Sequence, residues 1–240
     1  MAKLTKRQEK IKKLKEEISG PLSAEDAVKL LKQEHATKFD ETVEVHFRLG
    51  LDAKVGDQQI RSTVNLPGGS GREVRVAVVA KADKHTQAKE AGADIVGAED
   101  LITKIGDGFM EFDKLVATPD IMAALSKLGK VLGPKGLMPN PKDGTVTPDV
   151  GKIIKELKAG KVSFRSEKDG GVVQMPIGKL SFDDKRLLKN LAAVVEQVQK
   201  IKPPSVKGIY LRSVYLSSTM GPGLKLDLSK LQDLHSYLVA

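Results

Sequence analysis

The stretch VRVAVVA, residues Val74–Ala80, marks the point at which the pattern of the chain changes. This strand-like segment is apolar except for Arg75. It is followed in turn by KHTQAKEAG, ADIVG, AEDLITKIG, FDKLVAT and PDIMAALSKLG, which read as helix, strand, helix, strand and helix. Such an alternation predicts a small parallel sheet with helices on its faces.

The segments on either side of this unit have a different period. In TVEVHFRLGL (42–51), apolar residues alternate with Thr42, Glu44, His46 and Arg48, as in a half-buried strand with one polar face. A capping-box pattern at Ser23 and Asp26 predicts a helix before it. The other elements predicted from the flanks are a strand at 60–66, a hairpin at 161–178, a helix at 183–200 and a strand at 208–220, and a helix from 147 to 159 ends the unit between them.

Neither flank is self-sufficient, because the first supplies only two strands and leaves an open sheet edge. We therefore predict α/β combined with α+β: a discontinuous split α+β domain made of both chain ends (1–68 and 160–240), with a three-layer α/β domain (69–159) inserted into it. The two crossings between the domains are expected to lie side by side as a hinge. The residues predicted for this hinge are Pro67, Gly68, Gly71 and Gly160.

The charge of the chain indicates a polyanionic partner. The net charge is +9 and the isoelectric point is about 9.5. Seven cations and one acid lie in the first fifteen residues, so the remainder is only mildly basic. This basic start is either a solvated amphipathic helix or a nucleic-acid contact. It lacks the apolar region of a secretory signal, and the chain has no cysteine and no long apolar run, so we expect a cytoplasmic protein without a membrane partner.

The loop LGKVLGPKGLMPNPKDGTV (Leu128–Val146) resembles a phosphate cradle but does not meet its requirements. A Walker loop counted from Gly129 has Pro134 where its second glycine belongs. The dinucleotide fingerprint also fails, because no glycine occurs in the segment after VRVAVVA. The loop is therefore predicted to be a rigid excursion stiffened by prolines, which does no chemistry.

No other motif predicts catalysis or a metal site. The histidines are widely separated and none has a second histidine at metal-ligand spacing, which favours surface or edge positions for His35, His46, His85 and His235. The acidic pairs Asp183–Asp184 and Glu16–Glu17 lie at helix ends or on solvated faces, and helix-dipole and capping effects account for an acid at a helix start. We therefore expect no enzyme activity, no metal and no cofactor.

Four stretches resemble the bacterial large-subunit ribosomal protein L-one family, the stalk protein beside the tRNA exit site. They are IMAALSKLGKVLGPKGLMPN (121–140), KFDETVEVHFRLGLD (38–52), GTVTPDVGKIIKELKAGKVSFR (144–165) and LRSVYLSSTMGP (211–222). The match is in register almost from end to end. The departures from the family are the N-terminal tail and the C-terminal extension Gly223–Ala240, to which no role is assigned.

The resemblance implies a two-domain protein with a Rossmann-like inserted domain. It also implies binding to stalk ribosomal RNA, help in releasing deacylated tRNA from the exit site, and repression of translation through the protein's own mRNA. The protein would be located on ribosomes in the cytoplasm and would be a monomer outside them. Two alternatives remain, namely a free RNA-binding translational regulator and a protein–protein adaptor that needs a large exposed apolar patch.

The family's RNA contacts carry over to the discontinuous domain wherever its motifs match. They are Lys38, Phe39, Thr42, Glu44, Arg165, Ser213, Thr219, Met220 and Gly221. Small hydroxyl donors beside arginine suit 2′-OH and phosphate contacts, although the strand face is also consistent with an ordinary solvated sheet, and Phe39 with a core residue.

Two further expectations concern how RNA is contacted. The loop lysines Lys130, Lys135 and Lys142 either make a secondary contact with RNA or tRNA or are simply solvated. The aromatic content is only 4%, with no RNP-type run, so recognition of the shape of folded RNA is expected rather than single-strand stacking.

Overall fold

The computed structural model describes residues 5–18, 20–33, 37–52, 56–167 and 171–239. The chain divides into two compact units. Unit 1 comprises Met1–Ile60, Leu66–Gly71 and Phe164–Ala240, and unit 2 comprises Arg61–Asn65 and Arg72–Ser163. In the part of the chain that the model describes, no helix is long and apolar enough to cross a membrane.

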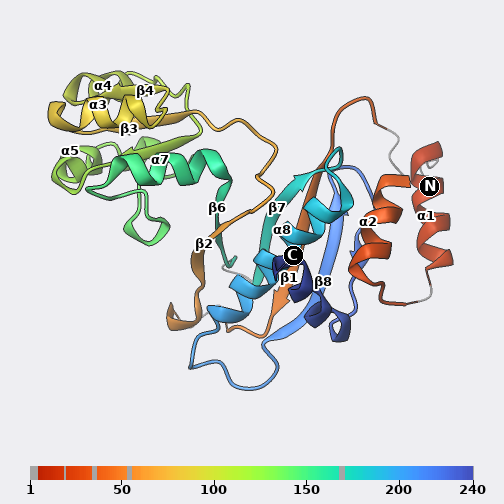
Figure 1. The fold of residues 1–240 in the computed structure, drawn as a ribbon. Helices are drawn as coiled ribbons and strands as arrows, with labels where there is room; N and C mark the ends of the chain where they lie inside the picture. The colour runs from red at the N-terminus through yellow and green to blue at the C-terminus, as the bar shows by residue number, and fades with distance from the viewer. Residues whose placement is uncertain (1–4, 19, 34–36, 53–55, 168–170, 240) are drawn as a thin grey trace. The chain divides into compact units, whose positions relative to one another are not determined.

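Unit 1 is built on an antiparallel four-stranded sheet (Figure 1). Its strands, in the order β7-β1-β8-β9, are Val172–Lys179, Thr42–Leu49, Leu211–Ser218 and Leu224–Lys225. Apolar side chains of β1 alternate with polar ones, and its apolar members are all buried. The sheet therefore has one apolar inner face and one open outer face, as the period-2 pattern predicts.

Helices bury the inner face of this sheet. α8 (Asp184–Lys200) packs on β7, α2 (Ala24–Gln33) packs on β8, and the two helices contact each other. The stripe Leu187, Leu191, Val194 and Val198 of α8 is fully buried, as its helical spacing predicts. A further basic helix, α1 (Lys6–Glu17), begins at a capping box in which Thr5 and Gln8 exchange hydrogen bonds.

The C-terminal extension is an integral part of unit 1. Its 3₁₀ helix η4 (Ser229–His235) and short helix α9 (Ser236–Val239) pack against α8, burying Leu231 and Leu234. The Tyr237 hydroxyl donates to Glu25 Oε1 of α2 at 2.6 Å. The extension thus contributes strand β9 to the sheet and packs its helical part against α8.

Unit 2 is a three-layer α/β unit. Its parallel sheet has the order β4-β3-β5, with strands Ile95–Gly97, Val76–Val79 and Lys114–Ala117. Residues 76 and 78 pack towards α3 (Ala82–Glu90) and α7 (Val150–Ala159), whereas residues 77 and 79 pack towards α4 (Glu99–Gly106), α5 (Met122–Ser126) and α6 (Gly129–Leu132). Because helices cover both faces, β3 is buried at every position, which explains its unbroken apolar sequence.

Two short strands and three 3₁₀ turns complete the fold. β2 (Arg61–Asn65) and β6 (Lys161–Arg165) form a separate two-stranded sheet. The 3₁₀ turns are η1 (Gly56–Gln58), η2 (Pro119–Ile121) and η3 (Pro141–Asp143). The residues of β2 belong to unit 2, although the sequence boundary at 68/69 placed them in the discontinuous domain.

The predicted hairpin at 161–178 is wrong as a strand pair. β6 pairs with β2, and β7 pairs with β1 in another sheet. The two segments share one bridge, Ser166–Val173, and the turn residues 168–170 lie outside the described residues. β7 belongs beside β1 because Val173, Met175 and Ile177 continue the apolar inner face of that sheet.

Candidate nucleic-acid interface

The outer face of the unit 1 sheet carries three of the nine residues that the sequence predicts for RNA contact, namely Thr42, Glu44 and Ser213, and five others lie in the segments that adjoin β1 and β8. Cross-strand neighbours on one face of a sheet interact directly, so the register defines rows of side chains across it. Three rows run from β7 through β1 to β8, and one of them reaches β9: Pro176, Glu44 and Ser217; Gln174, His46, Tyr215 and Lys225; Val172, Arg48 and Ser213.

At one end of this face, the chain after β8 is fastened to the start of β1. The Thr42 N–H donates to the Thr219 hydroxyl at 3.0 Å, and the Thr219 N–H donates to the Thr42 carbonyl at 3.0 Å. Lys179 at the end of β7 donates to the Thr42 hydroxyl at 2.9 Å. Three separate strands thus meet at Thr42.

A buried carboxylate organises the same end from beneath. Glu41 is only 1% exposed. Its Oε1 accepts from the Thr37 hydroxyl at 2.8 Å, while its Oε2 accepts from the Ser218 hydroxyl at 2.6 Å and from the Met220 N–H at 3.0 Å. A buried charge persists when several donors satisfy it, so Glu41 ties the segment before β1 to the turn after β8.

The turn Ser218–Gly221 ends on a glycine, at a position where a side chain would not fit. A Cβ on Gly221 would collide with Ser218 Oγ, the same hydroxyl that donates to Glu41. The Gly221 N–H donates to the Ser218 carbonyl at 3.1 Å, which closes the turn. Each of the residues Thr219, Met220 and Gly221 is thus tied to Glu41, Thr42 or Ser218 by a hydrogen bond of its backbone N–H.

Two apolar side chains project from this end into solvent. Phe39 is 51% exposed and Met220 is 49% exposed, so the alternative that Phe39 is a core residue is wrong. An open hollow of about 450 Å³ lies beside Phe39. It is lined by Lys32, Thr37, Lys38, Phe39, Asp40, Leu180 and Ser181. The hollow brings Lys38 and Phe39 together with the ends of α2 and β7.

The remaining predicted contacts lie at the opposite end of the strands. Ser213 is paired with Arg48, six residues along β1 from Thr42. Arg165 is exposed and precedes Ser166, which bridges Val173 beside that end. Since β1 has eight residues and a strand rises about 3.4 Å per residue, the two groups are roughly 20 Å apart along the face. The structure therefore shows one elongated face rather than a compact pocket.

The sequence did not predict Glu41 beneath this face or two side chains on it. Burial of a carboxylate such as Glu41 has no local signature in the sequence. Tyr215 and Lys225 occupy the outer face beside His46, and the alternation of β8 could have identified Tyr215. His46 Nε2 lies 2.8 Å from Ser217 Oγ and His85 Nε2 lies 2.9 Å from the Ala80 carbonyl, whereas His35 is outside the described residues.

The residues predicted as a hinge are held by different parts of the chain. Asn190, a fully buried polar residue of α8, accepts from the Gly68 N–H at 2.7 Å and donates to the Gly69 carbonyl at 3.0 Å. The segment 66–71 is therefore fastened within unit 1. Gly160 instead caps α7 with a left-handed φ of 113°. Hinge motion at Pro67, Gly68, Gly71 and Gly160 stays a prediction.

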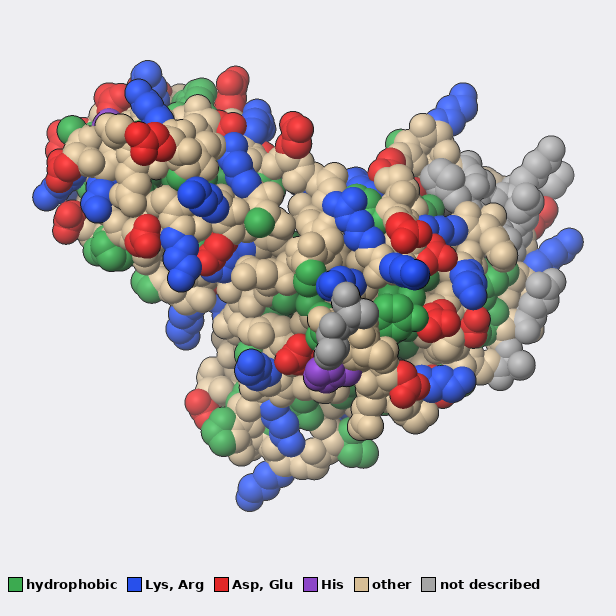
Figure 2. All heavy atoms as spheres, viewed as in Figure 1, with side chains coloured by type: hydrophobic (Ala, Val, Ile, Leu, Met, Phe, Trp, Pro, Cys, Tyr) green, Lys and Arg blue, Asp and Glu red, His purple; other side chains and the backbone are tan. Residues whose placement is uncertain are grey.

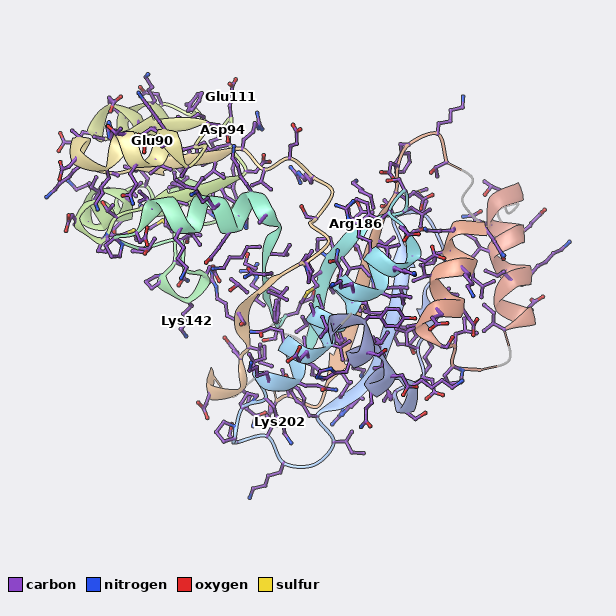
Figure 3. The ribbon with its side chains drawn as sticks, in the orientation of Figure 1. Glu90, Asp94, Glu111, Lys142, Arg186 and Lys202 are labelled. Carbon is purple, nitrogen blue, oxygen red and sulfur yellow. The ribbon has the colours of Figure 1, made fainter. Side chains whose placement is uncertain are left out.

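The three loop lysines belong to unit 2. Lys130, Lys135 and Lys142 are all exposed, and Lys142 extends outward from its loop (Figure 3). The end of the loop is fixed by Arg61, whose guanidinium makes a bidentate ion pair with Asp143. This pairing raises the pKa of Arg61 through a hydrogen bond and charge attraction. The loop is therefore a candidate surface of unit 2 in its own right.

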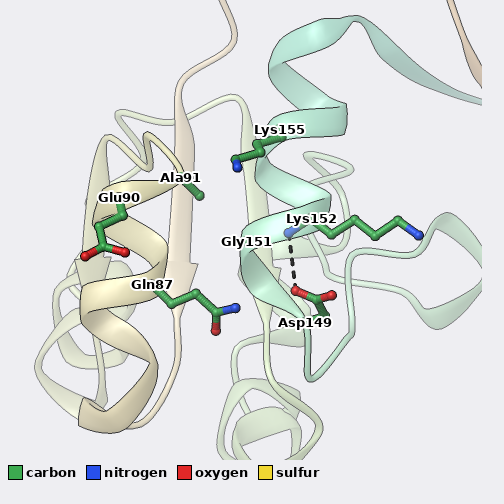
Figure 4. A pocket seen from close by; sticks show the side chains of 7 residues that line it. All are labelled: Gln87, Glu90, Ala91, Asp149, Gly151, Lys152 and Lys155. Carbon is green, nitrogen blue, oxygen red and sulfur yellow. Dashed lines mark hydrogen bonds between the residues drawn. The ribbon is translucent and has the colours of Figure 1, made fainter.

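Unit 2 also has a hollow between α3 and α7, of about 430 Å³ (Figure 4). Two acidic residues of its lining, Glu90 and Asp149, balance the positive charges of Lys152 and Lys155. Asp149 already caps α7 by accepting from the Lys152 N–H at 3.3 Å. The helix N-terminus is thus occupied by its own side chain, which makes this hollow a poor anion site.

The surface charge is mixed. In the view of Figure 2, basic and acidic side chains are interspersed over the surface. In the described part of the chain, no three histidine, aspartate or glutamate side chains gather into a metal-binding group.

Comparisons with known proteins agree on one family. The model of the ribosomal protein L1p/L10e family matches residues 30–222. The chain is 49% identical over 234 residues to the large ribosomal subunit protein uL1 of Prochlorococcus marinus (strain MIT 9215), covering 97% of this chain and 98% of that protein. It is 48% identical over 236 residues to the protein of the same name from Gloeobacter violaceus (strain ATCC 29082 / PCC 7421), covering 98% of each. With this match over most of its length, the chain belongs to the ribosomal protein L1p/L10e family.

Proposed function

We propose that this protein is a constituent of the large ribosomal subunit and that it binds ribosomal RNA of the stalk region through the outer face of unit 1. The relatives named above are large-subunit proteins that match nearly the full chain. The observation that carries the proposal is the Thr219–Met220–Gly221 turn, which Glu41 and Thr42 hold in place while Met220 remains half exposed.

The chemistry of the face suits folded RNA. A double-stranded RNA helix presents 2′-hydroxyls and phosphates across a wide, shallow minor groove. Hydroxyls of Thr219 and Ser213, the carboxylate of Glu44 and the cations Lys38 and Arg165 are groups that hydrogen-bond such a surface. Pre-organisation of the turn lowers the entropy lost on binding, so affinity does not depend on charge alone.

The two compact units suggest a division of labour. We assign RNA binding to unit 1 and propose that unit 2 is an inserted domain that moves about the predicted hinge. The exposed lysines of its loop would make a secondary contact with exit-site tRNA and so aid release of deacylated tRNA. Binding of a similar structure in the protein's own mRNA would repress translation. These roles place the protein on cytoplasmic ribosomes, as a monomer when free, with no enzymatic step.

The test is affinity for a folded stalk rRNA fragment and for a scrambled RNA of equal length, measured over a series of salt concentrations. Preference for the stalk fragment that persists at high salt is expected, since only non-specific binding depends wholly on counterion release. Equal and steeply salt-sensitive binding to both RNAs would overturn specific recognition by unit 1. Co-sedimentation with large subunits distinguishes a ribosomal constituent from a free RNA-binding regulator. RNase treatment distinguishes both from a protein–protein adaptor.

A further inference from the structure

Tyr215 differs from the other two tyrosines of the chain in how its side chain is used. Tyr210 is buried, its hydroxyl donates to the Val198 carbonyl at 3.0 Å, and burial raises its pKa to about 12. The Tyr237 hydroxyl donates to Glu25. Tyr215 is 38% exposed, and within the described part of the chain no residue forms a hydrogen bond with its hydroxyl. Two of the tyrosine hydroxyls therefore form hydrogen bonds within the fold, whereas the third tyrosine faces solvent.

The position of Tyr215 is central on the outer face. It lies on β8 between Ser213 and Ser217, whose side chains share its face, while Val214 and Leu216 on either side are buried. Its cross-strand neighbours are His46 on β1 and Lys225 on β9. The hydrogen bond between His46 Nε2 and Ser217 Oγ, at 2.8 Å, holds the imidazole on one side of the tyrosine. An aromatic ring is thus flanked by an ordered imidazole and an exposed ammonium group.

The charge of this face fits a nucleic acid. The cations Arg48, Lys179 and Lys225 occupy outward positions of the sheet. Among the described residues of its four strands, Glu44 is the one acidic side chain. A phosphate backbone that crosses this face meets positive charge near both ends of β1, with the exposed aromatic ring between them.

We propose that Tyr215 is a stacking platform for one unpaired base of the RNA, with Lys225 placed to contact a neighbouring phosphate. The inference rests on the RNA-binding function proposed above and adds a single-nucleotide contact to a site otherwise suited to the shape of an RNA helix. Base–aromatic stacking tolerates different bases because every base has a π-face. The platform therefore selects for an unpaired nucleotide at one place rather than for its identity.

The experiment uses the full chain with three substitutions and an abasic series of RNAs. Tyr215→Leu keeps an apolar side chain but removes the ring, Tyr215→Phe keeps the ring but removes the hydroxyl, and Gln232→Ala changes an exposed residue of η4 as the control. In the RNAs, each unpaired nucleotide of the stalk fragment is replaced in turn by an abasic one. Thermal unfolding of every variant confirms that folding is intact.

Tyr215→Leu is expected to bind the stalk fragment about 5- to 100-fold more weakly, while Tyr215→Phe and Gln232→Ala bind like the unchanged protein. One abasic RNA should weaken binding of the unchanged protein by the same factor and cause no further loss with Tyr215→Leu. Equal affinity of Tyr215→Leu and the unchanged protein would overturn the stacking platform, as would an equal loss with Tyr215→Phe. If the unchanged protein itself shows no preference for the stalk fragment over scrambled RNA, the proposed function fails, and that result is separate from the comparison of variants.

Discussion

The carboxylate of Glu41 accepts a hydrogen bond from the Ser218 hydroxyl at 2.6 Å, although 177 residues separate the two in sequence. Both residues are buried, at 1% and 6% exposed. The same carboxylate accepts from the Met220 N–H. Glu41 thus joins the start of β1 to the turn that follows β8, and it does so beneath the residues assigned to RNA contact.

Replacing Glu41 by glutamine should destabilise unit 1 by about 1–3 kcal/mol. Glutamine has one acceptor oxygen in place of two, so the donors on one side, either Thr37 or Ser218 and Met220, lose their acceptor and face an NH2 group. Denaturant unfolding measures the loss, with Glu196→Gln on the exposed side of α8 as the matched control. Affinity for the stalk fragment should fall as well, because the turn is no longer held. Unchanged stability and affinity would show that Glu41 does not organise this end.

Thr219→Ala and Met220→Ala should weaken RNA binding while leaving the fold intact. Thr219→Ala removes the hydroxyl that accepts from the Thr42 N–H, and this hydrogen bond contributes about 1 kcal/mol to stability. Met220→Ala removes a half-exposed side chain, so contact area is lost only in the complex. Filter binding or calorimetry with the stalk fragment measures the effect. Val131→Ala removes a partly exposed apolar side chain from unit 2 and is the control. If both variants bind like the unchanged protein, the site on unit 1 is wrongly placed.

Gly71→Ala should cost more stability than Gly136→Ala. The two glycines have nearly equal left-handed φ values, 72° and 68°, so backbone strain of about 1–2 kcal/mol is common to both. Only at Gly71 would the new Cβ meet other atoms, at 2.7 Å from Lys179 Cγ and 2.8 Å from Phe182 Cζ. Denaturant unfolding combined with amide hydrogen exchange assigns the loss to a unit. Equal losses would mean that Phe182 and Lys179 move aside at no cost.

Unit 2 should become less stable in acid because of Asp113. A hydrogen bond from the Arg75 N–H, with Arg72 and Arg75 beside it, lowers the pKa of this carboxyl below its usual 3.8. A group whose pKa is lower in the folded state stabilises the fold fully above its unfolded pKa, and that contribution is lost as the pH falls through the folded value. Thermal unfolding between pH 6 and 2 should therefore show a smaller acid loss for Asp113→Asn, which is already less stable at neutral pH. Asp107→Asn, at an exposed position of the same unit, is the control, and an identical acid profile for Asp113→Asn and the unchanged protein would contradict the prediction.

Local pattern was sufficient for most of the secondary structure. The period of two in β1 predicted its buried and exposed faces, and the helical spacing of leucines and valines predicted the buried stripe of α8. The unbroken apolar run of β3 predicted a strand covered on both faces. These features depend on residues close together in the sequence, so they can be predicted from the sequence directly.

Strand pairing and the assembly of the site depended on tertiary structure. The partner of β6 was mispredicted because a glycine-rich turn favours a hairpin locally, whereas burial of the inner face places β7 beside β1. The burial of Glu41 and the exposure of Phe39 likewise result from contacts between segments far apart in the chain. The sequence determined which residues alternate, cap and turn, since those properties are local. Only the folded chain determined which carboxylate is buried and which ring faces solvent, because burial is set by everything that packs around a residue.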